Sequence, residues 1–365
     1  MADWYGHGDR VAIKDSQTQI ITQSSATPAP PVAAAFAYIN DGDPDLFLYN
    51  ITTPAAPTAA GIYNGVGSPW SNPKKRGDFL YMGDFSSSTL HVFSVANTAA
   101  PTEVATVSQP FGEALYVALD DAPAGCVYLG ISGDQRIDVW DAIVPAAPVF
   151  VASQPTTSGD ARSLAQQGGN LFVLEYLAGP LTLRIYSSPC TLFTLEGEVD
   201  ITGYTNDAGV AVPGDGFAYV GGTKGVSGAA LRVVDVSDIT NPTLRGELIF
   251  PGAIGQSPVN IVVDGDFAYV CYGFGFGTGR PPWYVVAISD PDNPTLIATV
   301  TATAGQQFFA ISKIVGQDQV WLIRFVGAPP GNACSLVAYD VSTPATPTSI
   351  SSTPVDSSTQ FLLVA

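Results

Sequence analysis

Short stretches of alternating large apolar and polar residues recur along the chain, each followed by a polar turn that contains proline. The clearest copy spans Leu231–Asp238 and leads into Asn241-Pro242. Alternation with a period of two predicts a half-buried strand, and a proline after the turn forces an extended restart into the next strand. Each copy therefore predicts a strand, a turn and a second strand.

The same unit can be counted seven times along the chain. A Gly/Asp-aromatic hairpin marker, as in Gly265-Asp266-Phe267, precedes these strands, and a further short strand precedes the marker. Each repeat of roughly 45–50 residues thus supplies four strands. The strands before the turns are predicted at Leu46–Ile51, Leu90–Val95, Ile137–Asp141, Leu183–Tyr186 (a degenerate copy), Leu231–Asp238, Trp283–Ser289 and Leu336–Ser342.

The two ends of the repeat array complement each other. The first repeat begins at Ala34–Ile39 without an obvious preceding strand, and the chain ends with Phe361–Ala365, a strand with nothing after it. Placing the last strand in the first blade removes both unpaired edges. The sequence therefore predicts an all-β fold, a closed β-propeller of seven four-stranded antiparallel blades over residues 33–365.

Residues 1–32 fall outside the repeats and are predicted to form an N-terminal arm and linker. Thr18–Thr22 has the pattern of a short strand, and Ser24–Pro31 has the proline, alanine, threonine and serine content of a linker. Either the terminus is flexible, or the arm docks on a neighbouring subunit or on its own ring. We favour a docked arm, because a polar arm on a proline-rich tether stays ordered only when something holds it.

The composition of the chain limits the classes of partner that it is expected to bind. The formal net charge is −18, from 32 acids against 14 bases, so the surface repels phosphate backbones and nucleic acid is not expected to bind. No stretch is long and apolar enough to insert into a membrane. The first ten residues lack a basic start and an apolar core, so no conventional secretory signal is expected.

The cysteines and histidines give little sign of a metal site. Cys126, Cys190, Cys271 and Cys334 fall in four different blades without a CxxC pair, so we expect four free thiols and no zinc. His7 lies in the arm and His91 in a strand, and neither repeats around a ring. His91 is therefore expected to be a structural or surface residue.

No resident cofactor is expected, with calcium as the alternative. Asn40–Asp45 is the densest acidic run, and Asp41, Asp43 and Asp45 are alternate carboxylates that could hold Ca²⁺. An EF-hand would continue to a glutamate where this chain has Thr52. Asp, Gly and Pro are also ordinary hairpin residues, so a plain turn explains the run equally well.

Two segments are candidate binding surfaces. Lys74, Lys75 and Arg76 form the one basic cluster, near Trp70 in a predicted loop between blades; it could dock an acidic partner or be a solvated turn. Gly273–Arg280 lacks the helix and the Lys-Ser/Thr pair of a phosphate loop, and is predicted to be a long hairpin. Its aromatic and basic residues favour contact with a partner: Tyr272, Phe274, Phe276 and Arg280.

The unit around Leu231–Ser237, with Asn241-Pro242 and Gly265–Val270, resembles the LVIVD-repeat propellers over roughly residues 205–300, and more loosely elsewhere. The resemblance implies a surface-associated bacterial or archaeal protein and brings no agreed catalytic residues. The expected lack of a signal departs from that pattern.

Three hypotheses for function follow. The first is a non-enzymatic structural or interaction propeller in a larger assembly of protein subunits, anchored by its arm, such as a phage capsid decoration or tail-associated protein of the virion. The second is a cell-surface or extracellular adhesion propeller that binds a host-surface glycan or protein. The third is a propeller enzyme with a site at the central channel, which predicts convergent His, Asp or Glu side chains at the channel mouth, or a bound metal.

Overall fold

The computed structural model describes residues 12–14, 20–22, 34–41, 45–65, 71–84, 86–110, 112–120, 125–157, 159–176, 180–187, 190–191, 193–225, 228–251, 258–272, 282–303, 306–326, 333–355 and 359–365. The chain divides into two units, Met1–Ala34 and Ala35–Ala365. In the first, β1 (Ala12–Lys14) pairs antiparallel with β2 (Ile20–Thr22). β2 falls where the sequence predicts a short strand.

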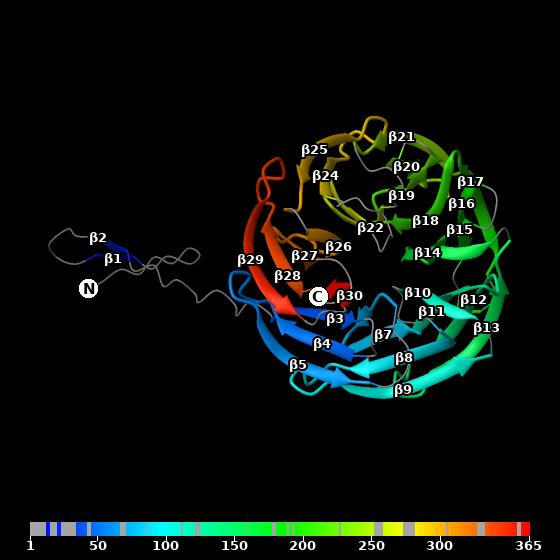
Figure 1. Cartoon of the computed structure of the whole chain (residues 1–365), viewed down its shortest axis with the longest axis horizontal. Coiled ribbons are helices and arrows are strands. Elements are labelled where there is room, and N and C mark those ends of the chain that lie inside the picture. The colour runs from blue at the N-terminus through cyan, green and yellow to red at the C-terminus, as the bar shows by residue number, and fades with distance from the viewer. Residues whose placement is uncertain are drawn as a thin grey trace. The chain divides into compact units, whose positions relative to one another are not determined.

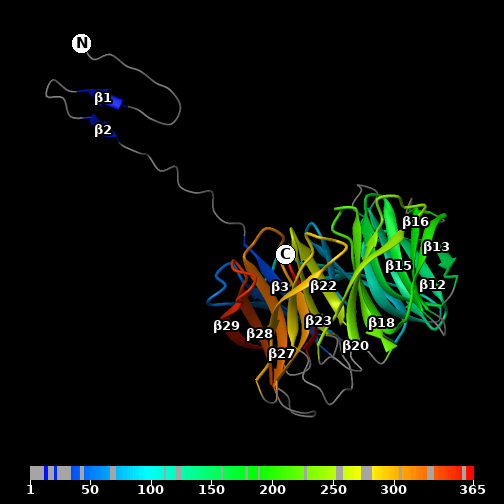
Figure 2. The ribbon, with the colours of Figure 1, turned by 90° about the horizontal axis from the view of Figure 1, so that it is seen from above.

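The second unit is a ring of seven four-stranded antiparallel sheets, as the sequence predicts (Figure 1). Seen from the side, the strands run between the same two faces of the ring (Figure 2). From the inner strand outward, blades 1 to 4 are β30 (Thr359–Val364), β3 (Phe36–Asp41), β4 (Asp45–Asn50), β5 (Thr58–Asn64); β6 (Lys74–Arg76), β7 (Phe79–Gly83), β8 (Ser88–Ser94), β9 (Thr102–Gln109); β10 (Glu113–Leu119), β11 (Cys126–Ser132), β12 (Arg136–Asp141), β13 (Val149–Pro155); β14 (Asp160–Gln167), β15 (Asn170–Tyr176), β16 (Leu181–Ser187), β17 (Leu195–Ile201).

Blades 5 to 7 are β18 (Tyr204–Ala211), β19 (Phe217–Lys224), β20 (Gly228–Asp235), β21 (Thr243–Ile249); β22 (Pro258–Asp264), β23 (Phe267–Tyr272), β24 (Trp283–Ala287), β25 (Thr295–Val300); β26 (Gln306–Ser312), β27 (Gln319–Val326), β28 (Ala333–Asp340), β29 (Thr348–Val355). Within the described ranges, the fold contains no helix able to cross a bilayer.

The last strand closes the ring inside the first blade. β30 pairs antiparallel with β3, with Tyr38 opposite Leu363 and Ala37 opposite Val364. The C-terminus accordingly lies beside β3 at the inner edge of blade 1 (Figure 1). The predicted exchange of strands between the two ends is confirmed.

The hydrophobic core is divided among the blade interfaces. Seven clusters of buried residues can be distinguished, and each joins residues of two neighbouring blades. Between blades 6 and 7, for example, the Trp283 ring stacks edge-on against Tyr339 with centroids 5.2 Å apart. The alternating large residues of the repeat therefore pack between sheets, where burying each aliphatic or aromatic side chain contributes about 1.5–3 kcal/mol.

The proline turns of the repeat connect each blade to the one before it. In blades 1, 3, 5 and 7 an Asp or Asn at the end of the third strand accepts a hydrogen bond from the backbone N–H two residues on, as Asp235 does from Ser237 at 3.1 Å. The turn then packs against a small residue on the preceding outer strand. Gly246 of β21 donates its N–H to Pro291 O at 2.9 Å, and Gly61 of β5 packs against Ala99.

Candidate functional site

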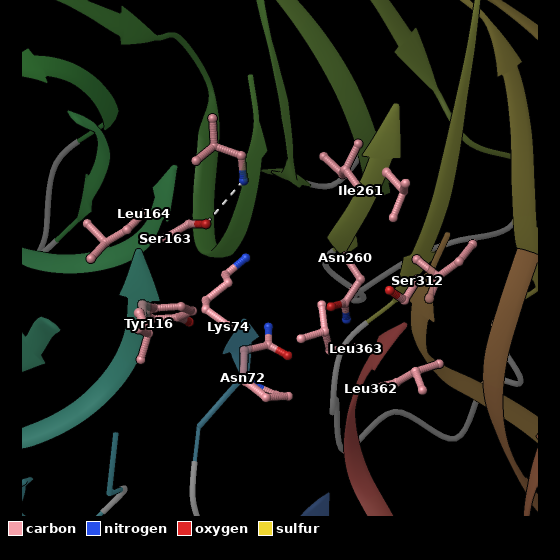
Figure 3. A pocket seen from close by; sticks show the side chains of 15 residues that line it. Asn72, Lys74, Tyr116, Ser163, Leu164, Asn260, Ile261, Ser312, Leu362 and Leu363 are labelled. Atoms are coloured by element: carbon pink, nitrogen blue, oxygen red, sulfur yellow. Dashed lines mark hydrogen bonds between the residues drawn. The ribbon is translucent and has the colours of Figure 1, made fainter. Parts of the chain in front are cut away.

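The central channel is the place where all blades contribute side chains to one space. A cavity of about 150 Å³ lies there, and every inner strand or the segment leading into it lines the cavity (Figure 3). Most of the lining residues are apolar, but polar atoms make up most of the surface that faces the cavity, and the polar side chains are a few amides, hydroxyls and one amine. The lining residues are Asn72, Pro73, Lys74, Tyr116, Val117, Ser163, Leu164, Val210, Asn260, Ile261, Val262, Ile311, Ser312, Leu362 and Leu363.

Several polar side chains of this lining connect neighbouring inner strands. Ser163 Oγ accepts the N–H of Val210 at 3.2 Å, joining blades 4 and 5. Ser312 Oγ accepts the N–H of Val364 at 3.0 Å, joining blade 7 to the closing strand. Asn260 Nδ2 donates to Phe309 O at 3.1 Å. These groups satisfy backbone atoms that face the channel, so their first role is to hold the ring together.

A second cavity of about 380 Å³ shares part of this lining. Lys74 and Lys75 both line it, together with Gln166 and mostly apolar side chains. Lys74 is half-buried and points into the narrower cavity (Figure 3). Burial among these residues lowers the pKa of its ammonium group.

The channel lining bears directly on the enzyme hypothesis. That hypothesis predicts convergent His, Asp or Glu side chains at the channel mouth, or a bound metal, and the described lining residues of both cavities include no His, Asp or Glu. Among the described residues, carboxylates such as Asp264 and the imidazole of His91 have partners outside this lining, within a blade or between blades. Arg184 of β16, for example, bonds Glu175 of β15 at 2.5 Å and Glu198 of β17 at 2.9 Å.

His91 belongs to such a structural pair. It is buried on β8, with Nδ1 2.6 Å from Glu103 Oε1 on β9 and Nε2 3.9 Å from Asp84 Oδ2. Burial opposes its charge, but hydrogen bonds with Asp84 and Glu103 outweigh that effect and raise its pKa. Burial likewise opposes ionisation of Glu103, yet hydrogen bonds with His91, Thr106 and Tyr63 lower its pKa to about 2.

The basic run lies in a different element from the one predicted. Lys74–Arg76 forms β6, the inner strand of blade 2, and neither a loop between blades nor a solvated turn. Arg76 stacks on Tyr81 at 5.1 Å and donates to the carbonyls of Gly125 and Cys126 at 2.8 and 3.2 Å. It thereby joins blade 2 to blade 3. Three consecutive basic residues suggest a surface turn. An inner strand beside a polar channel lacks the alternation of apolar and polar residues by which a strand is recognised.

Other candidate residues are only partly placed. Asp41 ends β3 and Asp45 begins β4, and Asp45 Oδ1 accepts the N–H of Gly65 at 3.0 Å. Asp43 lies between two described segments, so the calcium hypothesis stays a prediction. Tyr272 ends β23. The remaining members of the predicted surface, Trp70, Phe274, Phe276 and Arg280, lie outside the residues that the structure describes.

The expectation of four free thiols is wrong for one pair. Cys126, at the start of β11 in blade 3, forms a disulfide with Cys190, which lies between β16 and β17 in blade 4; their Cα atoms are 5.7 Å apart. Cys271 and Cys334 are free and buried. Counting blades misses the bridge because the turn of one blade packs on the blade before it. A cysteine in that turn therefore reaches a neighbouring blade.

The disulfide also marks the group of possible metal ligands found in the described ranges. A carboxylate oxygen of Asp120 and the sulfurs of Cys126 and Cys190 lie within 4.8 Å of one another. Asp120 Oδ1 accepts a hydrogen bond from Gln166 Nε2 at 3.2 Å. Metal ligation requires thiolates, so in the disulfide form only the Asp120 carboxylate remains as a ligand.

Blade 3 carries an exposed apolar edge that the sequence reasoning missed. Ile143 and Val144 in its outer turn and Val149 and Val151 on β13 are 62, 59, 62 and 37% exposed. The first three align with positions that are exposed in the other regular repeats, except that Thr52 is only partly exposed, and those positions hold polar or small residues. The equivalents are Thr52, Thr53, Thr58; Ala96, Asn97, Thr102; Ser237, Asp238, Thr243; Ser289, Asp290, Thr295; and Ser342, Thr343, Thr348.

Comparison of the repeats within the chain provides a signal that could have found this edge. The same turn forms in each regular repeat, with an i to i+3 hydrogen bond such as Ala147 N to Val144 O at 2.9 Å and Asn241 N to Asp238 O at 3.1 Å. Because the polar versions build the same turn, packing within the propeller does not require Ile143, Val144 or Val149. Contiguous exposed apolar residues are typical of interaction surfaces.

Solved structures of similar fold come from several organisms. A Lactobacillus plantarum protein is 14% identical, with a TM-score of 0.71 over 91% of this chain and 99% of that one. A proposed 6-phosphogluconolactonase from Bacteroides fragilis is 12% identical, with a TM-score of 0.70 over 93% and 99%. A hypothetical selenium-binding protein from Sulfolobus tokodaii is 10% identical, with a TM-score of 0.65 over 92% and 94%. At these identities the likeness shows the fold alone.

Comparison of the sequence with known families identifies a repeat in two segments of the chain. No curated protein matches the chain significantly. The LVIVD repeat matches residues 32–65 and 203–248, which include most of blades 1 and 5. Those segments hold the strand and proline turn on which the predicted resemblance rests. The chain is a seven-bladed β-propeller in which two segments match the LVIVD repeat.

Proposed function

We propose that this propeller is a non-catalytic interaction module that binds a protein partner in a larger assembly through the apolar edge of blade 3. The observation that carries the proposal is the contrast between repeats. Ile143, Val144 and Val149 stand where the other regular repeats hold polar or small residues, and each is about 60% exposed, at 62, 59 and 62%. Exposing them to water is unfavourable unless a partner covers them.

The free energy gained by covering these three side chains is large enough for binding to a protein. Covering one aliphatic side chain of this exposure contributes about 1–2 kcal/mol, so three together change affinity by roughly 100-fold or more. A few apolar anchors near the centre of an interface commonly supply most of its binding energy. Ser163, Asn260 and Ser312 of the channel already join neighbouring strands, and the outer edge is the surface better suited to a protein partner.

The proposal also covers the role of the N-terminal arm and the place of the protein in its native assembly. Residues 1–32 would anchor the propeller to neighbouring subunits, and the assembly we have in mind is a virion, as a capsid decoration or tail-associated protein. The support is compositional and comes from the sequence alone. Isolation of the native chain from its source is expected to recover it with virus particles; recovery with the cell surface would favour the adhesion alternative.

A triple variant that borrows residues from blade 5 tests the edge. Ile143→Ser, Val144→Asp and Val149→Thr reproduce Ser237, Asp238 and Thr243 at the matching positions. The variant is expected to keep its melting temperature, because exposed substitutions of this kind change stability by about 0.5 kcal/mol or less. Its share in the native assembly, measured by sedimentation, is expected to fall at least ten-fold.

A matched control changes exposed apolar residues elsewhere on the ring. Val315→Thr and Ile297→Thr alter side chains that are 72 and 36% exposed on blades 7 and 6, and incorporation should stay at the parent level. Deletion of residues 1–32 tests the arm separately. Full incorporation of the triple variant would refute the role of blade 3, and full incorporation of the deletion would refute the anchoring arm.

A further inference from the structure

The central channel is a positively charged space in an acidic chain. Lys74 is the one charged residue in the described lining of the narrower cavity, and Lys74 and Lys75 are the two in the described lining of the wider cavity. The chain as a whole carries a formal net charge of −18. A cation inside a channel attracts counter-ions more strongly than one on an open surface, because water screens it less.

Lys74 also differs from other cations of the ring in its partners. Lys313 Nζ lies 2.5 Å from Asp264 Oδ2, and Lys224 forms an ion pair with Glu247. The ammonium groups of Lys74 and Lys75 form neither an ion pair nor a hydrogen bond with any residue in the described ranges. Removing an ammonium group from water without a partner is unfavourable, and an anion beside it would restore the lost interaction.

Hydroxyl donors face the same cavity. Ser163 Oγ and Ser312 Oγ each use a lone pair to accept a backbone N–H, from Val210 and Val364 respectively. A hydroxyl that accepts in this way still has its own hydrogen to donate. Both serines line the narrower cavity with Lys74, so the polar groups there include hydrogen-bond donors directed at the space (Figure 3). The described lining offers no carboxylate that would repel an anion.

We infer that the central channel binds a small oxyanion, a carboxylate, phosphate or sulfate group, through Lys74 of β6, with serine hydroxyls as further donors. The narrower cavity of about 150 Å³ holds such a group with a few waters. The wider cavity of about 380 Å³ leaves room for the remainder of a small molecule that carries the group. This site is independent of the edge of blade 3.

Calorimetric titration of the full chain with sulfate tests the inference. The ionic strength is held constant with chloride, because a chain of net charge −18 responds to any salt. Saturable binding at one site per chain is expected. Lys74→Gln should weaken it roughly ten-fold or more, the effect of losing a charge-assisted hydrogen bond. Lys224→Gln, outside the channel, should leave it unchanged.

Two further experiments identify the preferred ligand and the charge state of Lys74 that binds it. Acetate and phosphate replace sulfate, and the tighter of the two shows whether the site prefers a planar or a tetrahedral group. Sulfate binding should also weaken as the pH rises through the lowered pKa of Lys74, below the ordinary value of 10.5, because only the ammonium form attracts the anion. Binding unchanged across that range would overturn the role of Lys74.

Thermal unfolding gives a readout that does not depend on calorimetry. Without oxyanion, Lys74→Met should melt at the parent temperature or above it, because a desolvated charge is replaced by an apolar group of similar length. Sulfate should raise the melting temperature of the parent and leave that of Lys74→Met unchanged. No saturable heat with the parent, or equal stabilisation of both proteins by sulfate, would refute the inference.

Discussion

Phe36 and Ala365 exchange two backbone hydrogen bonds: Phe36 N donates to Ala365 O at 2.9 Å, and Ala365 N donates to Phe36 O at 3.0 Å. These residues lie at opposite ends of the ring unit, yet they form a single antiparallel pair. The pair continues the ladder between β30 and β3. Blade 1 therefore depends on both ends of the sequence, and the ring closes only when the last residues are in place.

Deletion of residues 359–365 removes β30 and should open the ring. Blade 1 would lose its inner strand and the inner faces of blades 1 and 7 would lose Leu362 and Val364, which are 6 and 4% exposed. Together the lost burial and ladder hydrogen bonds amount to about 4 kcal/mol or more. Urea unfolding should show a lower midpoint, and limited proteolysis should cut within blade 1.

Deletion of the arm is the matching control. Ala35–Ala365 forms a compact unit by itself, so removing residues 1–32 should leave the urea midpoint unchanged. A C-terminal deletion that unfolded at the parent midpoint would show that closure contributes little to the stability of the ring.

Reduction of the disulfide should destabilise the contact between blades 3 and 4. Cys126 and Cys190 are separated by 64 residues, and closing a loop of that length in the unfolded chain contributes about 4 kcal/mol to stability in the chain-entropy treatment. Guanidinium unfolding with and without dithiothreitol should reveal the difference. Cys190→Ser should unfold like the reduced parent, and the reductant should not affect it further; any larger response of that variant would place the redox effect elsewhere.

Much of the propeller can be predicted from its sequence because each repeat encodes its own turn. In four repeats an Asp or Asn at the strand end helps to specify the turn, and all seven repeats have a proline downstream, so counting the copies gives the number of blades. Closure follows from edge strands, since Phe361–Ala365 and Ala34–Ile39 each lack a partner until they are joined. Both arguments use only local chemistry and backbone hydrogen bonding.

The site could be predicted less well, because it depends on which strand faces the channel. Lys74 lies on a three-residue strand with no apolar alternation, and nothing local distinguishes such a strand from a turn. Cys190 lies in the degenerate repeat, where the register of the turn is weakest. The exposure of Ile143 and Val144 can be predicted from the sequence, but only when the repeats are aligned with one another and the exposed positions are compared.

Gly246 should be intolerant of a side chain. A Cβ at this position would lie 2.7 Å from the carbonyl of Asp292, and closer still to Cδ of Pro294, in the turn of the next blade. Gly246→Val should therefore lower the free energy of unfolding by about 3 kcal/mol, because the turn cannot move without losing the hydrogen bond from Gly246 N to Pro291 O. Ala298→Gly, at the equivalent position of β25, should cost about 1 kcal/mol or less.

The pair of His91 and Glu103 should give the stability a defined pH dependence. The pKa of His91 is raised above 6.5, so its contribution is complete below 6.5 and is lost as the pH rises through the raised value. The pKa of Glu103 is lowered to about 2, so its contribution is complete above 4.5 and is lost as the pH falls toward 2. The pair is therefore expected to stabilise the fold most between these two ordinary values.

Substituting His91 or Glu103 alone separates the loss of stability at higher pH from the loss of stability at lower pH. His91→Gln should flatten the loss of stability at higher pH, and Glu103→Gln should flatten the loss at lower pH, each at a cost of about 2–3 kcal/mol near pH 5.5. His91→Gln leaves the half-buried Glu103 without its imidazolium partner, and Glu103→Gln leaves His91 only the longer contact with Asp84, so the double variant should cost less than the sum of the two. Urea unfolding from pH 3 to pH 9 measures all four proteins, and strictly additive costs with unchanged limbs would show that His91 and Glu103 do not form an ion pair in solution.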